Sequence, residues 1–205
     1  MFNINYDYDK MKDRMFTIVR DEEFIDQCAP DAAVYHAGHG LACTMHVLIR
    51  DDELKAHFTI TNQLLKEANV SSEKAFYDAI DAQRKMNPPR IGELGAMLRE
   101  LNHETDMSTD GVMYVVTNAT GYNGASTIFY PDVKEDIANV FGGGYYILPS
   151  SIHEVLAVPD GITSPEALLE MVRDINLGQV APEERMANAV YHYNPTTRAF
   201  RKVAG

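Results

Sequence analysis

The sequence predicts an α+β fold, in which helices pack against a mainly antiparallel sheet. The 205-residue chain contains about eight strand-like apolar runs and five or six helical stretches. The helices follow pairs of strands instead of alternating with single strands, which is typical of α+β proteins and not of doubly wound parallel sheets. No internal repeat and no linker rich in proline, glycine or serine divides the chain, so we expect a single domain over residues 1–205.

The first 40 residues show the weakest periodicity, and we expect an irregular N-terminal segment over residues 1–40. Within it, residues 10–19 fit either a short helix or a short strand. Residues 41–49 are then apolar, and residues 57–61 alternate between apolar and polar side chains. The short charged link at residues 50–53 predicts that these two segments form an antiparallel strand pair.

Helices dominate the next stretch. Residues 63–67 predict a short helix, and Ser71 is expected to cap a longer one that ends at Asn87-Pro88-Pro89. The buried face of the longer helix is predicted to carry Ala75, Phe76, Ala79 and Ile80. The apolar spacing of residues 91–101 predicts a further helix, and residues 102–110 read as a polar loop.

The clearest strand of the second half covers residues 112–117, which are almost wholly apolar and therefore predict a central strand. Residues 125–130 predict the next strand, after a turn at residues 121–124. Pro131 suits the first turn of a helix that ends at residues 142–144. The buried face of this helix is predicted to carry Val133, Ile137, Val140 and Phe141.

Two further strands, residues 145–148 and 155–158, flank a polar block at residues 149–154. Ser164-Pro165 then predicts a helix start, because a capping hydroxyl precedes a proline at the first helical position. The buried face of that helix is predicted to carry Leu168, Met171, Val172 and Ile175. Residues 188–193 and 198–203 predict a closing hairpin.

The composition excludes several classes of protein. The formal net charge of −12 disfavours direct nucleic-acid binding, since phosphates repel an acidic surface, and it suits a basic protein partner. No apolar run approaches the roughly 20 residues that a membrane-spanning helix needs, and the N-terminus lacks the apolar stretch of a secretory signal. We therefore expect a cytoplasmic protein without a membrane contact, and we interpret Cys28 and Cys43 as buried small hydrophobes.

Several motifs resemble those of a bacterial domain family of unknown function that is abundant in anaerobic gut Gram-positive bacteria. They are MYVVTN (113–118), YNGA (122–125), YYILPSSIHEVLAVP (145–159), EALLEMVRDIN (166–176), QVAPEE (179–184) and VYHY (190–193). The best-matched core is residues 111–205, with a weaker match over residues 60–79. The histidines at residues 36–46 fall outside the family pattern, and family members usually carry an additional N-terminal region. The resemblance implies a cytoplasmic accessory protein and supplies no catalytic residues.

One candidate metal site lies in the first half of the chain. It consists of His36, His39, Cys43 and His46, whose imidazole and thiolate groups are zinc ligands. The spacing is not that of a standard zinc module. In a strand, Cys43 and His46 would also point to opposite faces, because they are an odd number of positions apart. We therefore expect no cofactor and keep zinc as an alternative.

The polar block at residues 149–154 carries the candidate catalytic residues Ser151, His153 and Glu154. A hydroxyl, an imidazole and a carboxylate are the components of nucleophilic catalysis, although known triads usually converge from separate parts of a chain. The alternative is a hydrogen-bonded corner in which a serine caps the turn. No G-x-S-x-G elbow, Walker loop or GxGxxG motif is present in the sequence.

Asn118, Tyr122, Asn123 and Ser150 are candidate binding residues, because the two turns that hold them are expected to lie close together. Asparagines at strand ends equally satisfy their own backbone in turns. The leading hypothesis is a non-enzymatic protein-binding or regulatory module with an acidic surface, for which an inhibitor of a nucleic-acid enzyme is one form. The alternative is a hydrolase that uses residues 150–154, with or without a metal.

Overall fold

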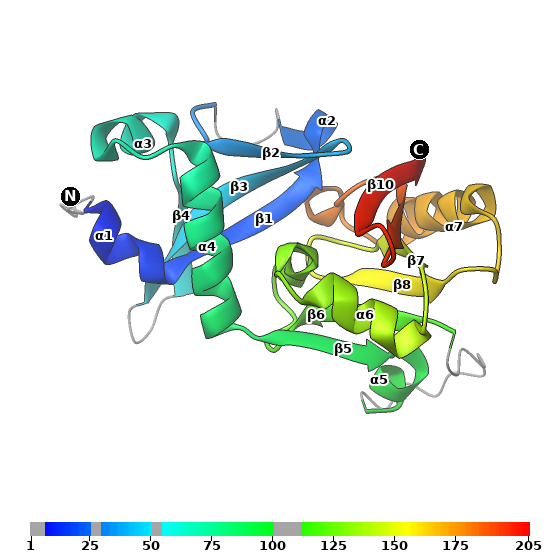
Figure 1. Ribbon diagram of the computed structural model, residues 1–205. Helices are drawn as coiled ribbons and strands as arrows, with labels where there is room; N and C mark the ends of the chain where they lie inside the picture. Colours follow the sequence, from blue (N-terminus) through cyan, green and yellow to red (C-terminus); the bar gives the residue numbers. More distant parts are fainter. Residues whose placement is uncertain (1–6, 26–29, 51–54, 101–111) are drawn as a thin grey trace. The chain divides into compact units, whose positions relative to one another are not determined.

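The computed structural model describes residues 7–25, 30–50, 55–100 and 112–205, and it confirms the α+β class. The strands form two antiparallel sheets, where the sequence predicted one (Figure 1). The chain divides into two compact units, Met1–Pro88 and Pro89–Gly205, and each contains one of these sheets. The predicted polar loop at residues 102–110 and the interpretation of Cys28 fall outside the described residues.

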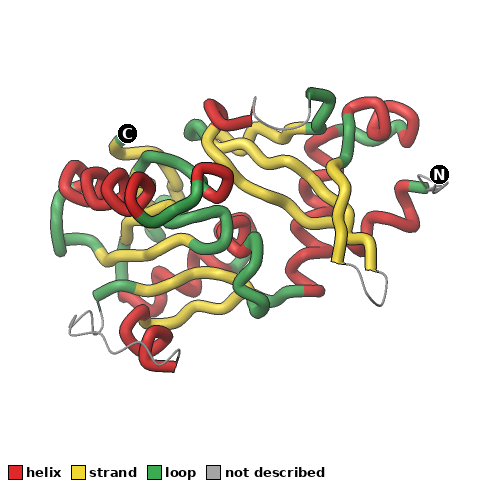
Figure 2. The backbone as a smooth tube through the Cα atoms, turned by 180° about the vertical axis from the view of Figure 1, so that it is seen from behind, coloured by secondary structure: helices red, strands yellow, loops and turns green. Residues whose placement is uncertain are grey.

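The sheet of the first unit is organised around β3 (Leu41–Arg50) (Figure 2). Strand β1 (Met15–Asp21) pairs with one edge of β3, while β2 (Val34–Gly38) and β4 (Lys55–Thr59) pair in succession with the other. The predicted pairing of the segments now seen as β3 and β4 is confirmed.

The prediction of an irregular segment over residues 1–40 is wrong, since β1 and β2 lie there. The first three residues of β1 are all buried, so its sequence lacks the alternation that marks a strand with one face in water. A short helix, α1 (Tyr8–Met11), a 3-10 turn, η1 (Lys12–Arg14), and a second short helix, α2 (Glu22–Ile25), flank β1.

Helix α4 (Ser72–Met86) packs against β1 and follows the short helix α3 (Asn62–Ala68). The predicted cap is confirmed, because the Ser71 hydroxyl accepts the Lys74 backbone N–H at 3.1 Å. The predicted apolar face is also confirmed, and all four of its residues are buried: Ala75, Phe76, Ala79 and Ile80.

The sheet of the second unit has six antiparallel strands in the order β10-β9-β7-β8-β6-β5. Their bounds are β5 (Pro89–Glu93), β6 (Tyr114–Asn118), β7 (Tyr145–Pro149), β8 (Val155–Pro159), β9 (Val190–Asn194) and β10 (Ala199–Ala204). Strand β6 lies between β8 and β5, which confirms the predicted interior strand, and β9 and β10 form the predicted hairpin.

One predicted helix of this unit is confirmed only in part, and one predicted strand is wrong. The first residues of the predicted helix over residues 91–101 belong to strand β5, where Ile91 pairs with Val116. The helix itself, α5, covers Leu94–Glu100. The Glu93 carboxylate precedes it and accepts the N–H groups of Gly95 and Ala96 in its first turn. The predicted strand at residues 125–130 is a 3-10 helix, η2 (Gly124–Phe129). Residues 124–128 are all buried, so their composition does not distinguish a buried strand from a buried helical turn.

Two helices cover opposite faces of this sheet. Helix α7 (Pro165–Gly178) packs against β7, β9 and β10, and its core residues Leu168 and Val172 contact Leu148 and Val158. Helix α6 (Val133–Phe141) lies on the other face, where the Tyr145 hydroxyl donates to the Lys134 carbonyl oxygen. Val140 and Met171, which were predicted to be buried, are 49% and 39% exposed. Among the described residues, no helix is both long and apolar enough to cross a bilayer.

A buried glutamine links α4 to β1. The Gln83 side chain is 1% exposed, and its oxygen accepts both the backbone N–H and the hydroxyl of Thr17, each at 3.1 Å. We expect Gln83→Leu to lower the free energy of unfolding by about 1–3 kcal/mol, because a buried backbone N–H would lose its acceptor. Urea denaturation measures the change. Gln63→Leu, on the exposed side of α3, is the control and should stay within about 0.5 kcal/mol of wild type; equal losses in both variants would contradict this account.

Candidate functional site

The polar block between β7 and β8 is a closed, hydrogen-bonded corner. The Ser151 backbone N–H donates to the Glu154 carbonyl oxygen at 3.1 Å, and the Ser151 hydroxyl donates to Glu154 Oε1 at 2.9 Å. The same hydroxyl oxygen accepts the His153 backbone N–H at 3.0 Å. Ser151 therefore forms hydrogen bonds to both sides of the turn. This agrees with the alternative from the sequence analysis, in which the block is a hydrogen-bonded corner and a serine caps the turn.

The His153 ring is held at both of its nitrogens. Nδ1 lies 3.1 Å from the backbone nitrogen of Asn123 and accepts its N–H, and Nε2 lies 3.3 Å from Glu184 Oε1. Because Nδ1 is an acceptor, the neutral ring carries its proton on Nε2 and donates it to the Glu184 carboxylate. The His153 side chain is 19% exposed, so the ring lies at the surface with only a small part open to water.

A further set of contacts fixes the corner to β6 and η2. The Thr117 hydroxyl donates to the His153 carbonyl oxygen at 2.8 Å, and the Ala125 backbone N–H donates to the Ile152 carbonyl oxygen at 3.2 Å. Gly124 lies directly between these segments. A Cβ at that position would contact Thr117 Oγ1 and would lie 2.6 Å from the His153 carbonyl oxygen, so only glycine fits there.

The candidate catalytic residues do not form a nucleophile–base pair in this arrangement. The Ser151 hydroxyl directs its proton to Glu154, and both nitrogens of His153 are engaged by Asn123 and Glu184. A serine nucleophile needs its hydroxyl hydrogen-bonded to the imidazole that removes the proton. The contacts of Ser151, His153 and Glu154 instead stabilise the corner.

The structure brings three of the four candidate binding residues to the corner from the other side. Asn118 stabilises its own turn, because Nδ2 donates to the Tyr122 carbonyl oxygen at 2.8 Å and Oδ1 accepts from Thr120. Asn123 is buried in the left-handed conformation, with φ of 50°. Tyr122 is 57% exposed, and its ring centroid lies 5.1 Å from that of His153 with the planes inclined by 30°.

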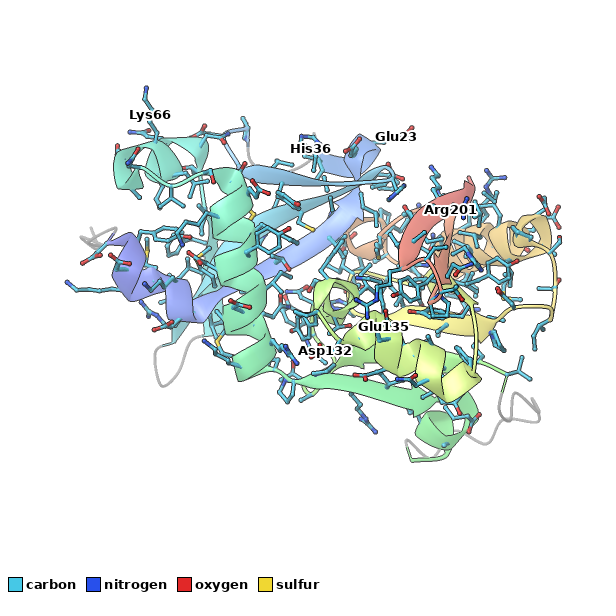
Figure 3. All side chains as sticks on the ribbon, viewed as in Figure 1. Glu23, His36, Lys66, Asp132, Glu135 and Arg201 are labelled. Atoms are coloured by element: carbon cyan, nitrogen blue, oxygen red, sulfur yellow. The ribbon has the colours of Figure 1, made fainter. Side chains whose placement is uncertain are left out.

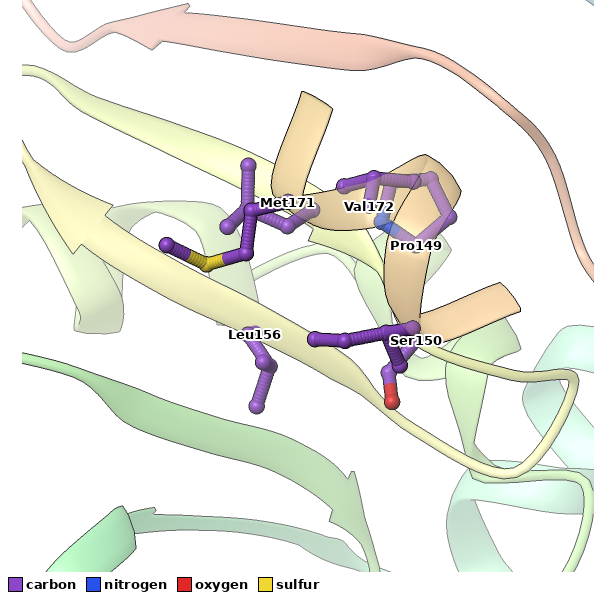
Figure 4. Close-up of a pocket in the computed structure, with 7 residues that line it drawn as sticks. Pro149, Ser150, Leu156, Met171 and Val172 are labelled. Atoms are coloured by element: carbon purple, nitrogen blue, oxygen red, sulfur yellow. The ribbon is translucent and has the colours of Figure 1, made fainter. Parts of the chain in front are cut away.

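Ser150, the fourth candidate, lines a small apolar pocket next to the corner (Figure 4), whose volume of about 10 Å³ has room for about one water molecule. The pocket lies between α7 and the strands β7 and β8. The other residues that line it are Leu148, Pro149, Leu156, Met171, Val172 and Ile175.

Glu184 is a site residue that the sequence analysis did not single out. It lies in the 3-10 turn η3 (Pro182–Glu184), where its carbonyl oxygen accepts the Ile152 N–H at 2.8 Å and its carboxylate binds His153. Its side chain is 46% exposed. The available signal was the QVAPEE motif, which contains Glu184 and accompanies the motif of residues 145–159 in the resemblance.

The candidate metal ligands do not converge. His36 lies on β2 (Figure 3), and its Nδ1 is 2.9 Å from Glu22 Oε1. His39 lies in an exposed turn with φ of 58°, and Cys43 is fully buried, as predicted. The ring of His46 lies between two threonine hydroxyls, with Nε2 2.9 Å from Thr44 Oγ1 and Nδ1 3.2 Å from Thr59 Oγ1. Within the described ranges, no three His, Cys, Asp or Glu side chains are placed to hold a metal ion.

Burial shifts the pKa values of two of these candidate metal ligands, His46 and Cys43. Burial, with smaller contributions from the neighbouring His57 and Arg20, lowers the pKa of His46 to about 3, so the ring is neutral near pH 7. Burial also raises the pKa of the Cys43 thiol, which disfavours the thiolate that a metal would need.

The chain belongs to a family of unknown function, DUF5688, whose sequence model matches residues 2–195. This match confirms the resemblance to a family of unknown function. It also extends over the N-terminal unit and includes the histidines at residues 36–46, which the resemblance left out. Neither a curated protein nor a solved structure matches the chain.

The contacts of Gly124 generate the first prediction from this site. We expect Gly124→Ala to lower the free energy of unfolding by about 1–3 kcal/mol, because the new methyl group would separate Thr117 from the His153 carbonyl. Thermal or urea denaturation gives the change. Gly143→Ala is the matched control, since no atom lies within 4 Å of a Cβ built there, and an equal effect in both variants would argue against the tight approach at Gly124.

The neutral His46 generates a prediction about pH. In the unfolded chain a histidine takes up its proton near pH 6.5, while folded His46 resists protonation down to about pH 3, so protons favour the unfolded state in this window. Stability should therefore fall as the pH falls from 6.5, and His46 should account for about 2 kcal/mol of the loss between pH 7 and pH 5. Urea titrations of His46→Gln should show that much less pH dependence. His39→Asn, at an exposed turn, is the control, and a wild-type slope in His46→Gln would refute the assignment.

Proposed function

We propose that this member of a family of unknown function is a non-enzymatic protein-binding or regulatory module of the bacterial cytoplasm. One observation carries the proposal. The polar side chains of the corner satisfy each other, while Tyr122 remains 57% exposed on the ring of His153. An enzyme would keep its reactive groups available to substrate, whereas a binding surface needs rigid, exposed anchors.

The surroundings of Tyr122 make it a rigid anchor. Its carbonyl oxygen is held by Asn118, the next residue donates its N–H to His153, and one side of its ring packs on that histidine. Tyrosine is enriched in protein interfaces, because it supplies a large contact area with few rotatable bonds.

The charge of the chain supports a basic partner. With a formal net charge of −12, the protein attracts positively charged surfaces and repels phosphate. A nucleic-acid enzyme carries a basic groove, and an acidic protein that occupies such a groove would inhibit it. The partner in this form of the proposal is a nucleic-acid enzyme of the host or of a mobile element.

The test is capture of a partner by the tagged full-length protein, followed by a binding measurement with the purified, identified partner. We expect Tyr122→Ala to weaken that binding by about tenfold or more, as the loss of a central interface tyrosine commonly does. Tyr77→Ala is the matched control, because Tyr77 is 54% exposed and lies on α4 in the other unit.

An opposite result is equally clear. That result is hydrolysis of an ester, a phosphoester or a peptide by the purified wild-type protein, with the turnover abolished in Ser151→Ala or His153→Ala. This outcome would replace the proposal with the hydrolase alternative.

A further inference from the structure

A surface pocket of the first unit lies between the end of β4 and the helix α3 that follows it (Figure 1). Its volume is about 310 Å³, which is within the range of small-molecule sites. An apolar cavity of about 150 Å³ already holds a benzene ring, so this pocket has room for a ring with a short side chain. The residues that line it are Phe58, Thr59, Thr61, Gln63, Leu64 and Glu67.

Two polar side chains of the pocket form a pair on one face of α3. Gln63 and Glu67 are four positions apart, and Gln63 Nε2 donates to Glu67 Oε1 at 2.9 Å. This bond leaves Glu67 Oε2 and Gln63 Oε1 able to accept further hydrogen bonds. Among the described contacts, neither oxygen has a donor and the Glu67 carboxylate has no ion pair. The wall of the pocket therefore carries a negative charge that its own residues do not compensate.

The remaining lining residues supply a third acceptor and two apolar walls. Thr61 Oγ1 accepts the Leu64 backbone N–H at 3.1 Å, and its second lone pair can accept another hydrogen bond. Leu64 is buried and Phe58 is half-buried, so both are anchored in the unit. The pocket thus combines a carboxylate, an amide oxygen and a hydroxyl with apolar side chains, which suits a ligand with a hydrogen-bond donor at one end and an apolar body.

We infer that this pocket binds a small primary amine, whose ammonium group lies between Glu67 and Gln63 and whose apolar part packs on Phe58. An ammonium group has three N–H donors and no acceptor, which matches the carboxylate, amide and hydroxyl oxygens of the wall. The formal net charge of −12 favours a cation over a carboxylate or a phosphate. A quaternary ammonium group would keep the charge but could not donate a hydrogen bond to these oxygens.

The test is an NMR titration of the full-length protein with 2-phenylethylamine at low ionic strength. We expect a dissociation constant in the millimolar range, which is usual for a ligand of this size, and chemical-shift changes at Phe58 and Leu64. 2-Phenylethanol, which carries a hydroxyl group on the same body, should bind about fivefold more weakly, because it has no charge. Trimethyl(2-phenylethyl)ammonium should also bind more weakly than the amine, because it has no N–H donor.

Two substitutions of exposed side chains locate the site. Glu67→Gln removes the charge and should weaken the binding of 2-phenylethylamine about fivefold, and Gln63→Leu removes an acceptor and should weaken it about threefold. Glu73→Gln is the matched control. It removes the same charge from an exposed residue of the same unit that does not line the pocket, so the amine should bind this variant as it binds wild type.

Four results would overturn the amine site. They are an absence of binding at millimolar concentrations of the amine, equal affinity for the amine and the alcohol, wild-type affinity in Glu67→Gln, and shift changes that exclude Phe58 and Leu64.

The amine site and the proposed partner surface can be tested separately, because the pocket lies in the first unit and Tyr122 lies in the second. If a purified partner depends on Tyr122 but the amine does not bind, the proposed function stands and the amine site falls. If the amine binds as expected but no partner depends on Tyr122, the amine site stands and the proposed function falls.

Discussion

The organisation of the C-terminal corner depends on the two hydrogen bonds of the His153 ring. Nδ1 accepts from the backbone of Asn123 in one loop, and Nε2 donates to Glu184 in another, so a single imidazole joins three segments that are distant in sequence. Protonation of both nitrogens would turn Nδ1 into a donor facing another donor. The same geometry that positions Tyr122 over the ring therefore also requires that the ring stay neutral.

His46 and His153 show two ways to satisfy an imidazole that is fully or largely buried. His46 lies between Thr44 and Thr59 in the first unit, where hydroxyl groups can turn to match whichever nitrogen carries the proton. His153 lies against a backbone N–H, which cannot turn, and against a carboxylate, which only accepts. The partners of His46 in the core accommodate either tautomer, whereas the partners of His153 near the surface allow only one.

The accuracy of the sequence predictions follows from how local each signal is. Ser71 and Ser164 were correctly assigned as helix caps, because a cap bond spans only three residues. Ile91 was misassigned, since its state depends on pairing with Val116, which is 25 positions away by residue number. The block at residues 150–154 was predicted to be either reactive or structural. The sequence left this choice open because the partners of His153, at Asn123 and Glu184, are distant along the chain. Glu184 was missed because its contact with His153 crosses 31 positions, and only the joint occurrence of two motifs hinted at it.

Among the described tyrosines, Tyr77 and Tyr122 are the most exposed, and a comparison of their surroundings supports the corner as the proposed contact surface. Tyr77 packs on Phe76 and Tyr35, with ring centroids 5.3 and 6.1 Å away, and the hydrogen bond between Tyr77 and Tyr35 contributes to a Tyr35 pKa of about 12. Its ring and hydroxyl thus belong to an aromatic cluster that the N-terminal unit uses for itself. Tyr122 has one described ring contact, the small and polar imidazole of His153, which buries much less apolar surface. Tyr122 therefore contributes little to the stability of its own unit, which supports its proposed role as a contact for a partner.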